Sequence, residues 1–221
     1  MHILTDQIIK TLLPGMYLPK PLELLLAWIE DNDLCVQYDR GRMGYLFPEE
    51  RVRSALNDAE IPGGTMFRFI AEGNDSLGHW FGNDQPEIVN RLCVFGFSGC
   101  EGSRAAFWLD DDGRQKIVHM GSGSGSTMVC VLADDPIDFL RLLAIGYDEI
   151  CWPEKLSKPP NADRREDEPI ILPNLAYQEW VRKTFSVSIP RVGTEIAKHP
   201  AEMGDKNSPD PFCRWVEQNA G

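Results

Sequence analysis

The sequence predicts an α+β fold: a central, mainly antiparallel sheet flanked by N- and C-terminal helices. Segments with helical periodicity stand near both ends of the chain, and a series of β-like segments lies between them. Strand and helix do not alternate regularly, which disfavours βαβ units and a parallel sheet.

The first predicted helices lie in the N-terminal 33 residues. "TDQIIKTLL" offers Thr5 or Asp6 as the N-cap, and "KPLELLLAWIEDND" places Pro21 in a first turn. The apolar stripe of the second helix runs through Leu22, Leu25, Leu26 and Ile29.

The predicted strands follow. "LCVQYDRGRMGYLFP" is typical of a hairpin, "TMFRFIAEG" alternates like a strand, and "RLCVFGF" is apolar enough for a strand buried on both faces. "SRAAFWLDDDGRQKIVHM" predicts a second hairpin with its turn at Asp110 to Gly113. "TMVCVLA" is the last predicted strand, and the run GSGSGS (121–126) joins it to the hairpin.

"ADDPIDFLRLLAIGY" predicts a helix capped by Asp134 or Asp135, with Pro136 at its first position and Gly146 at its end. We therefore expect an α+β domain over residues 1–153. Residues 154–173, polar and rich in proline, are expected to be a loop or linker. Residues 174–221 are expected to form a C-terminal helical extension that packs on the same domain, with helices in "NLAYQEWVRKTF" and "DPFCRWVEQNAG".

The net charge of the chain limits the classes of partner that it is expected to bind. A formal net charge of −12 repels nucleic-acid backbones and suits a basic protein partner, although acidity also serves solubility.

No signal peptide and no apolar run of ~20 residues is visible, so we expect a cytoplasmic protein without a membrane span. The six cysteines have no C-x-x-C spacing and are expected to be reduced.

Motifs for catalysis are incomplete. The Gly/Ser run has no Lys for a P-loop and no following helix for a dinucleotide loop, so a turn between strands is the favoured interpretation. "VFGFSGC" has Cys100 where a nucleophile elbow needs glycine. No zinc or EF-hand ligand set is present, so we expect no catalytic residues, no metal and no cofactor. An enzyme with an unrecognised site at His79 and Asp84 is the remaining catalytic alternative.

Several of these segments, in this order, resemble the SUKH superfamily, named in part after a yeast regulator of cell-wall synthesis. The segments are "FRFIAEGNDSLGHWFGND", "AFWLDDDG", "KIVHMGSGSGSTMVCVLADDPIDFLRLLAIGYDEI", "EWVRKTFSVSIPRVGTEI" and "DPFCRWV". The similarity covers roughly residues 60 to 216. It implies an α+β fold with a largely antiparallel sheet, and bacterial members are commonly cytoplasmic immunity proteins that bind and neutralise a toxin.

The resemblance therefore implies a non-catalytic immunity protein that blocks the active site of a cognate toxin, for example a nuclease. The alternative is a cytoplasmic scaffold or regulator that binds an endogenous partner. The superfamily has no shared binding residues, so candidate contacts follow from surface chemistry alone: acidic turns around an aromatic anchor. These candidates are Asp75, His79, Trp80, Asp84, Asp110, Asp111 and Asp112; the competing interpretation is that the acidic side chains only solvate turns.

Overall fold

The structure, a computed structural model, describes residues 2–39, 41–54, 59–64 and 66–220. Within them a seven-stranded sheet has the order β1-β2-β4-β5-β6-β7-β8, and every neighbouring pair is antiparallel. Its strands are β1 (Cys35–Tyr38), β2 (Gly41–Gly44), β4 (Arg68–Gly73), β5 (Leu92–Phe97), β6 (Arg104–Leu109), β7 (Gln115–Met120) and β8 (Val129–Ala133). A separate two-stranded parallel sheet pairs β3 (Glu60–Pro62) with β9 (Ile170–Leu172). The predicted α+β class with a mainly antiparallel sheet is confirmed.

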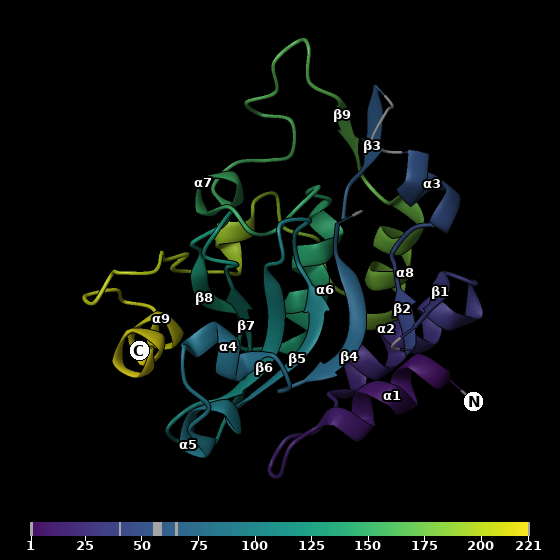
Figure 1. The fold of residues 1–221 in the computed structure, drawn as a ribbon. Helices are drawn as coiled ribbons and strands as arrows, with labels where there is room; N and C mark the ends of the chain where they lie inside the picture. Colours follow the sequence, from purple (N-terminus) through teal and green to yellow (C-terminus); the bar gives the residue numbers. More distant parts are fainter. Residues whose placement is uncertain (1, 40, 55–58, 65, 221) are drawn as a thin grey trace.

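Helices cover both faces of the large sheet (Figure 1). The first face packs against α1 (Ile3–Thr11), α2 (Lys20–Asp31), α6 (Pro136–Ile145) and α8 (Leu175–Phe185). The second face packs against α4 (Leu77–Phe81), α5 (Pro86–Val89) and α9 (Pro211–Asn219). The described chain also contains α3 (Glu49–Ser54), α7 (Pro153–Leu156) and the 3₁₀ helix η1 (Gly193–Glu195).

The alternation of side chains along β6 explains the two cores. Ala105 and Phe107 point into the core under α1, α2, α6 and α8, whereas Ala106 and Trp108 point into the core under α4, α5 and α9. Successive residues of a strand face opposite sides of a sheet, so a strand buried on both faces must be apolar at nearly every position. β5 has the same pattern, as its apolar sequence predicts.

The helix α6 forms where the sequence predicts it. Its N-cap is Asp135, whose Oδ1 accepts a hydrogen bond from the Ile137 N–H at 2.7 Å, and Pro136 occupies the first turn. The helix ends at Gly146, whose φ of 94° lies in the left-handed region that glycine tolerates best.

The start of α1 differs from its prediction. Neither Thr5 nor Asp6 is the N-cap: the helix begins at Ile3. The carboxylate of Glu30, on α2, accepts hydrogen bonds from the backbone N–H groups of Ile3 (2.8 Å), Leu4 (2.7 Å) and Thr5 (3.3 Å). A side chain distant in sequence thus satisfies the free donors of the first turn, so no local capping residue is required.

The outer edge of β8 is covered by the segment that leads into α9. The Met203 N–H donates to the Thr127 carbonyl oxygen at 2.8 Å, and the carboxylate of Asp210 accepts from the Val131 N–H at 2.9 Å. Asp210 also caps α9 through the Cys213 N–H, at 2.8 Å. This coverage satisfies donors that an edge strand leaves open, and it brings α9 beside the Gly/Ser run.

Candidate functional site

The predicted contact residues fall into two groups at different places on the molecule. Asp75, His79, Trp80 and Asp84 lie on or beside α4, while the acidic residues 110–112 form the turn between β6 and β7. Arg104, the first residue of β6, lines the pocket beside α4, whereas the acidic turn follows Leu109, the last residue of β6. The six residues of this strand therefore separate the two groups. That length corresponds to roughly 20 Å. The structure therefore does not bring the seven residues into one pocket.

The acidic turn has its charges compensated locally. A carboxylate oxygen of Asp110 accepts hydrogen bonds from the N–H groups of Asp112 (3.0 Å) and Arg114 (2.8 Å), which is the turn chemistry expected of aspartate. Asp111 pairs with Arg91 at 2.8 Å, and Asp112 pairs with Arg114 at 3.4 Å. This geometry favours a structural role for Asp110 and leaves little excess negative charge at the turn.

His79 and Trp80 lie in a short helix, not in the glycine-rich loop that the sequence predicts. Leu77 and Phe81 are four residues apart, share one helix face and are both buried against the sheet. Gly82, with φ of 69°, ends the helix. The burial of this apolar pair explains the helix, and it turns His79 outward to an exposed position.

Trp80 connects α4 to the Gly/Ser run. Its indole Nε1–H donates a hydrogen bond to the Gly121 carbonyl oxygen at 2.7 Å. The run itself is a turn between β7 and β8, as predicted: the Gly121 N–H bonds to the Met128 carbonyl at 2.8 Å, and the Gly123 N–H to the Ser126 carbonyl at 2.9 Å. The side chain at position 80 thereby fixes the loop against the helix.

The Gly/Ser run does not form a phosphate cradle. The Gly123 N–H is already bonded within the turn, the Ser122 N–H donates to Ser103 Oγ at 3.2 Å, and the Gly125 N–H donates to Ser122 Oγ at 3.0 Å. Phosphate-binding loops instead present free N–H groups and usually the positive end of a helix dipole. The interpretation of the run as a turn is confirmed.

A cavity of about 470 Å³ lies where α4, the Gly/Ser run, the connection from β5 to β6 and the C-terminal helix meet. We call it the α4–α9 pocket. Its most informative lining side chains are His79, Trp80, Glu101, Arg104, Met203 and Glu217. It therefore contains two of the predicted contact residues together with the loop they support.

The α4–α9 pocket has an excess of negative charge. Arg104 is already paired with Glu72, Nε to Oε1, at 3.1 Å. Glu217 and Glu101 are oriented by hydrogen bonds: Glu217 accepts from the Gly204 N–H at 2.7 Å, and Glu101 accepts from both the N–H and the hydroxyl of Ser103. These bonds hold two carboxylates at the lining without neutralising them.

Sequence reasoning missed Glu101, Met203 and Glu217 as site residues. Each comes from a separate segment, and only the packing of α9 over the sheet places Met203 and Glu217 opposite α4. No local pattern around these residues signals a site. The hydrophobic face of α9 predicts a helix but not its neighbour.

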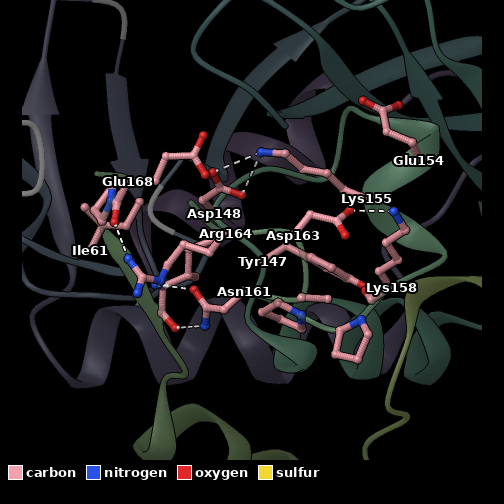
Figure 2. Close-up of a pocket in the computed structure, with 15 residues that line it drawn as sticks. Ile61, Tyr147, Asp148, Glu154, Lys155, Lys158, Asn161, Asp163, Arg164 and Glu168 are labelled. Carbon is pink, nitrogen blue, oxygen red and sulfur yellow. Dashed lines mark hydrogen bonds and ion pairs between the residues drawn. The ribbon is translucent and has the colours of Figure 1, made fainter. Parts of the chain in front are cut away.

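A second cavity, of about 440 Å³, lies between the β3/β9 sheet and the polar segment expected to be a loop or linker (Figure 2). That segment is joined to the body of the protein by the pairing of β9 with β3, and Asn161 connects two parts of the segment itself. The Asn161 side chain bonds both to the carbonyl (2.9 Å) and to the N–H (2.8 Å) of Ile171.

Most charged side chains of this second cavity already have a partner. Figure 2 shows Lys155 beside Asp148 and Lys158 beside Asp163, at 3.3 Å and 2.5 Å. Arg164 donates to the carbonyl of Glu168 at 2.7 Å. A charged ligand would have to break these contacts, so the α4–α9 pocket is the stronger candidate site.

The segments that contain α4, α5 and α9 are acidic. The segments 74–90 and 201–220, which we call the acidic layer, carry seven carboxylates and two cations, a net charge of −5. The carboxylates are Asp75, Asp84, Glu87, Glu202, Asp205, Asp210 and Glu217, and the cations are Lys206 and Arg214. The helices themselves do not differ in net charge: α1, α2, α6 and α8 carry six carboxylates and five cations, and α4, α5 and α9 carry two carboxylates and one cation. The excess of negative charge in the acidic layer therefore lies mainly in its connecting loops.

No protein-family model, curated protein or solved structure matches this chain. The resemblance to the SUKH superfamily therefore stays a prediction. Among the described residues, no helix is both long and apolar enough to span a membrane. In the same part of the chain, no group of three or more His, Cys, Asp or Glu side chains could hold a metal ion.

Proposed function

We propose that the chain is a cytoplasmic immunity protein that binds a basic toxin through its acidic layer and blocks the toxin active site without chemistry of its own. The observation that carries this proposal is the acidity around the α4–α9 pocket: the two segments of the acidic layer carry −5 of the net charge of −12.

Such an acidic layer would speed the association of the protein with its toxin. A toxin that acts on nucleic acid needs a basic groove for its substrate, and an acidic surface is attracted to that groove over a distance of about 10 Å at ~0.1 M salt. Complementary charge raises the association rate and disfavours wrong partners. Rapid capture matters for an inhibitor that must act before the toxin reaches its substrate.

The sequence resemblance supports the same function independently of charge. The motifs occur in the order expected for the SUKH superfamily, and the α+β fold with its antiparallel sheet has the architecture that the resemblance implies. Four of the predicted contact residues, Asp75, His79, Trp80 and Asp84, belong to the acidic layer. The acidic turn at residues 110–112 is the weaker part of the predicted contact set, because its charges are compensated.

The test is co-expression with the product of the gene directly upstream, scored by survival of the cells and by formation of a stoichiometric complex. One variant neutralises four exposed carboxylates of the acidic layer: Asp75→Asn, Asp84→Asn, Glu87→Gln and Glu202→Gln. A matched variant makes the same changes on α1, α2 and α8 of the opposite layer: Asp6→Asn, Glu23→Gln, Asp31→Asn and Glu179→Gln.

We expect the acidic-layer variant to lose protection and to associate with the toxin at least about tenfold more slowly, whereas the matched variant keeps both properties. Raising salt from ~0.05 M to ~0.5 M should slow association of the unaltered protein in the same way. Equal behaviour of the two variants, or a complex indifferent to salt, would contradict the acidic-layer mechanism. An upstream product that is harmless on its own would contradict the immunity function and favour the scaffold alternative.

A further inference from the structure

The Trp80 ring is held in one orientation at the α4–α9 pocket. Its Nε1–H is bonded to the Gly121 carbonyl, and its ring contacts Phe81 edge-on, with centroids 4.7 Å apart. Met203 and Val216 add apolar surface to the lining. A side chain that enters the pocket therefore meets an aromatic group whose position is set before binding, which reduces the entropy lost on association.

Two acidic residues line the same cavity from different elements, and both oxygens of Glu101 already accept hydrogen bonds from Ser103. Glu101 comes from the connection between β5 and β6, and Glu217 comes from α9. Oε1 of Glu217 accepts the bond from the Gly204 N–H, while its Oε2 takes no hydrogen bond from the described residues. Glu217 thus has a free oxygen on a carboxylate whose orientation is fixed.

Arg104, the cation of this lining, is not free to neutralise the pocket. Its guanidinium is paired with Glu72, which also accepts a hydrogen bond from Ser76. Among the described lining residues two are acidic, and Arg104 is already paired, so an anionic ligand would find no unpaired Arg or Lys there. The pocket is therefore suited to a cation.

We infer that the α4–α9 pocket receives one arginine side chain of the partner protein. A guanidinium is planar, stacks on an aromatic ring, donates five N–H bonds in a fixed fork and sheds water more easily than an ammonium group. The fixed indole, the free oxygen of Glu217 and the serine hydroxyls of the Gly/Ser run match those properties. This inference rests on the proposed function, since it names the anchor of the same interface.

The probe is N-acetyl-L-arginine N-methylamide, titrated into ¹⁵N-labelled protein and followed by the indole N–H signal of Trp80, assigned by comparison with Trp80→Phe. The matched probe carries citrulline, which replaces the guanidinium by an uncharged urea of nearly the same shape. A lysine analogue has the same positive charge on an ammonium group, so comparing it with the arginine probe tests whether the planar guanidinium is required. We expect saturable binding of the arginine probe with Kd on the order of 1 mM and markedly weaker binding of the other two.

Two variants connect the result to the pocket. Glu217→Gln keeps an oxygen for the Gly204 N–H but removes the charge, and should weaken the arginine probe about tenfold. Glu179→Gln makes the same change on α8 of the opposite layer and should have no effect. No saturable shift up to ~50 mM, equal binding of the citrulline probe, or indifference to Glu217→Gln would overturn the arginine site.

The two proposals can fail separately. If the acidic-layer variant loses toxin protection but the arginine probe does not bind, the proposed function stands and the anchor is wrong. If the probe binds as expected but neutralising the acidic layer leaves protection unchanged, the arginine site stands and the proposed mechanism of immunity is wrong.

Discussion

Replacing Glu30 should give a clearly measurable loss in the free energy of unfolding. Its side chain is only 5% exposed and pairs with Arg42 at 2.8 Å. It also accepts the first three N–H groups of α1, from Ile3, Leu4 and Thr5. Glu30→Ala would leave those donors without their acceptor and a partly buried guanidinium without its partner.

The magnitude follows from the two losses. Breaking a buried ion pair from one side costs about 3–5 kcal/mol, and losing a helix cap costs about 0.5–2 kcal/mol. Arg42 retains 28% exposure, so water recovers part of the first loss. We therefore expect the free energy of unfolding to fall by about 3 kcal/mol, with a melting temperature roughly 6–12 °C lower for a chain of this size.

Urea denaturation followed by circular dichroism measures this loss directly. Glu23→Ala is the matched control on the same helix, because Glu23 and its partner Lys20 are both well exposed and their pair contributes at most about 0.5 kcal/mol. A loss below about 1 kcal/mol for Glu30→Ala, or a loss equal to that of Glu23→Ala, would refute the reasoning that Glu30 caps α1 from α2.

Three further predictions concern the sheet and its loops. Burial lowers the pKa of His119 to about 4, against about 6.5 unfolded, so its contribution to stability is present above pH ~6.5 and should be lost, by roughly 3 kcal/mol, as pH falls to ~4. His119→Asn should flatten urea-derived stability across that window, and an unchanged pH dependence would count against it. Gly121→Ala should lower the free energy of unfolding by more than about 3 kcal/mol, because the added Cβ would lie 2.6 Å from the Ser126 carbonyl oxygen. In Gly123→Ala the added Cβ meets open space, so we expect a loss of about 1 kcal/mol that comes only from the positive φ. Similar losses for the two variants in thermal melts would contradict this prediction. Asp210→Ala, which removes the acceptor shared by the edge of β8 and the start of α9, should cost about 2–4 kcal/mol, and a loss no larger than that of exposed Asp205→Ala would exclude the shared role.

The predictions that succeeded depend on local chemistry. In α6, Asp135, Pro136 and Gly146 are each favoured at one position of a helix for reasons contained in a few neighbouring residues. The hairpin of β6 and β7 has the same character, because Asp110 accepts from N–H groups two and four residues away. Such elements follow from the sequence almost irrespective of what packs on them.

The predictions that failed depend on distant partners. Thr5 and Asp6 are reasonable caps for α1, yet Glu30 performs that role from another helix. The residues around His79 and Trp80 have the glycine content of a loop, yet burial of flanking apolar side chains against the sheet makes them helical. In both cases a long-range contact outweighs a local preference of about 1 kcal/mol.

The sequence by itself determined the α+β class, the order of the strands along the chain and the net negative charge, because hydrophobic period, turn residues and composition are local or additive properties. Only the tertiary structure decided that the acidic segments 74–90 and 201–220 pack on the same face of the sheet and that Trp80, Glu101 and Glu217 line one pocket. Those facts depend on which face each helix covers. The face that a helix covers is selected by the packing free energy of the whole core. This free energy depends on residues from many segments, so it cannot be read from any short stretch of sequence.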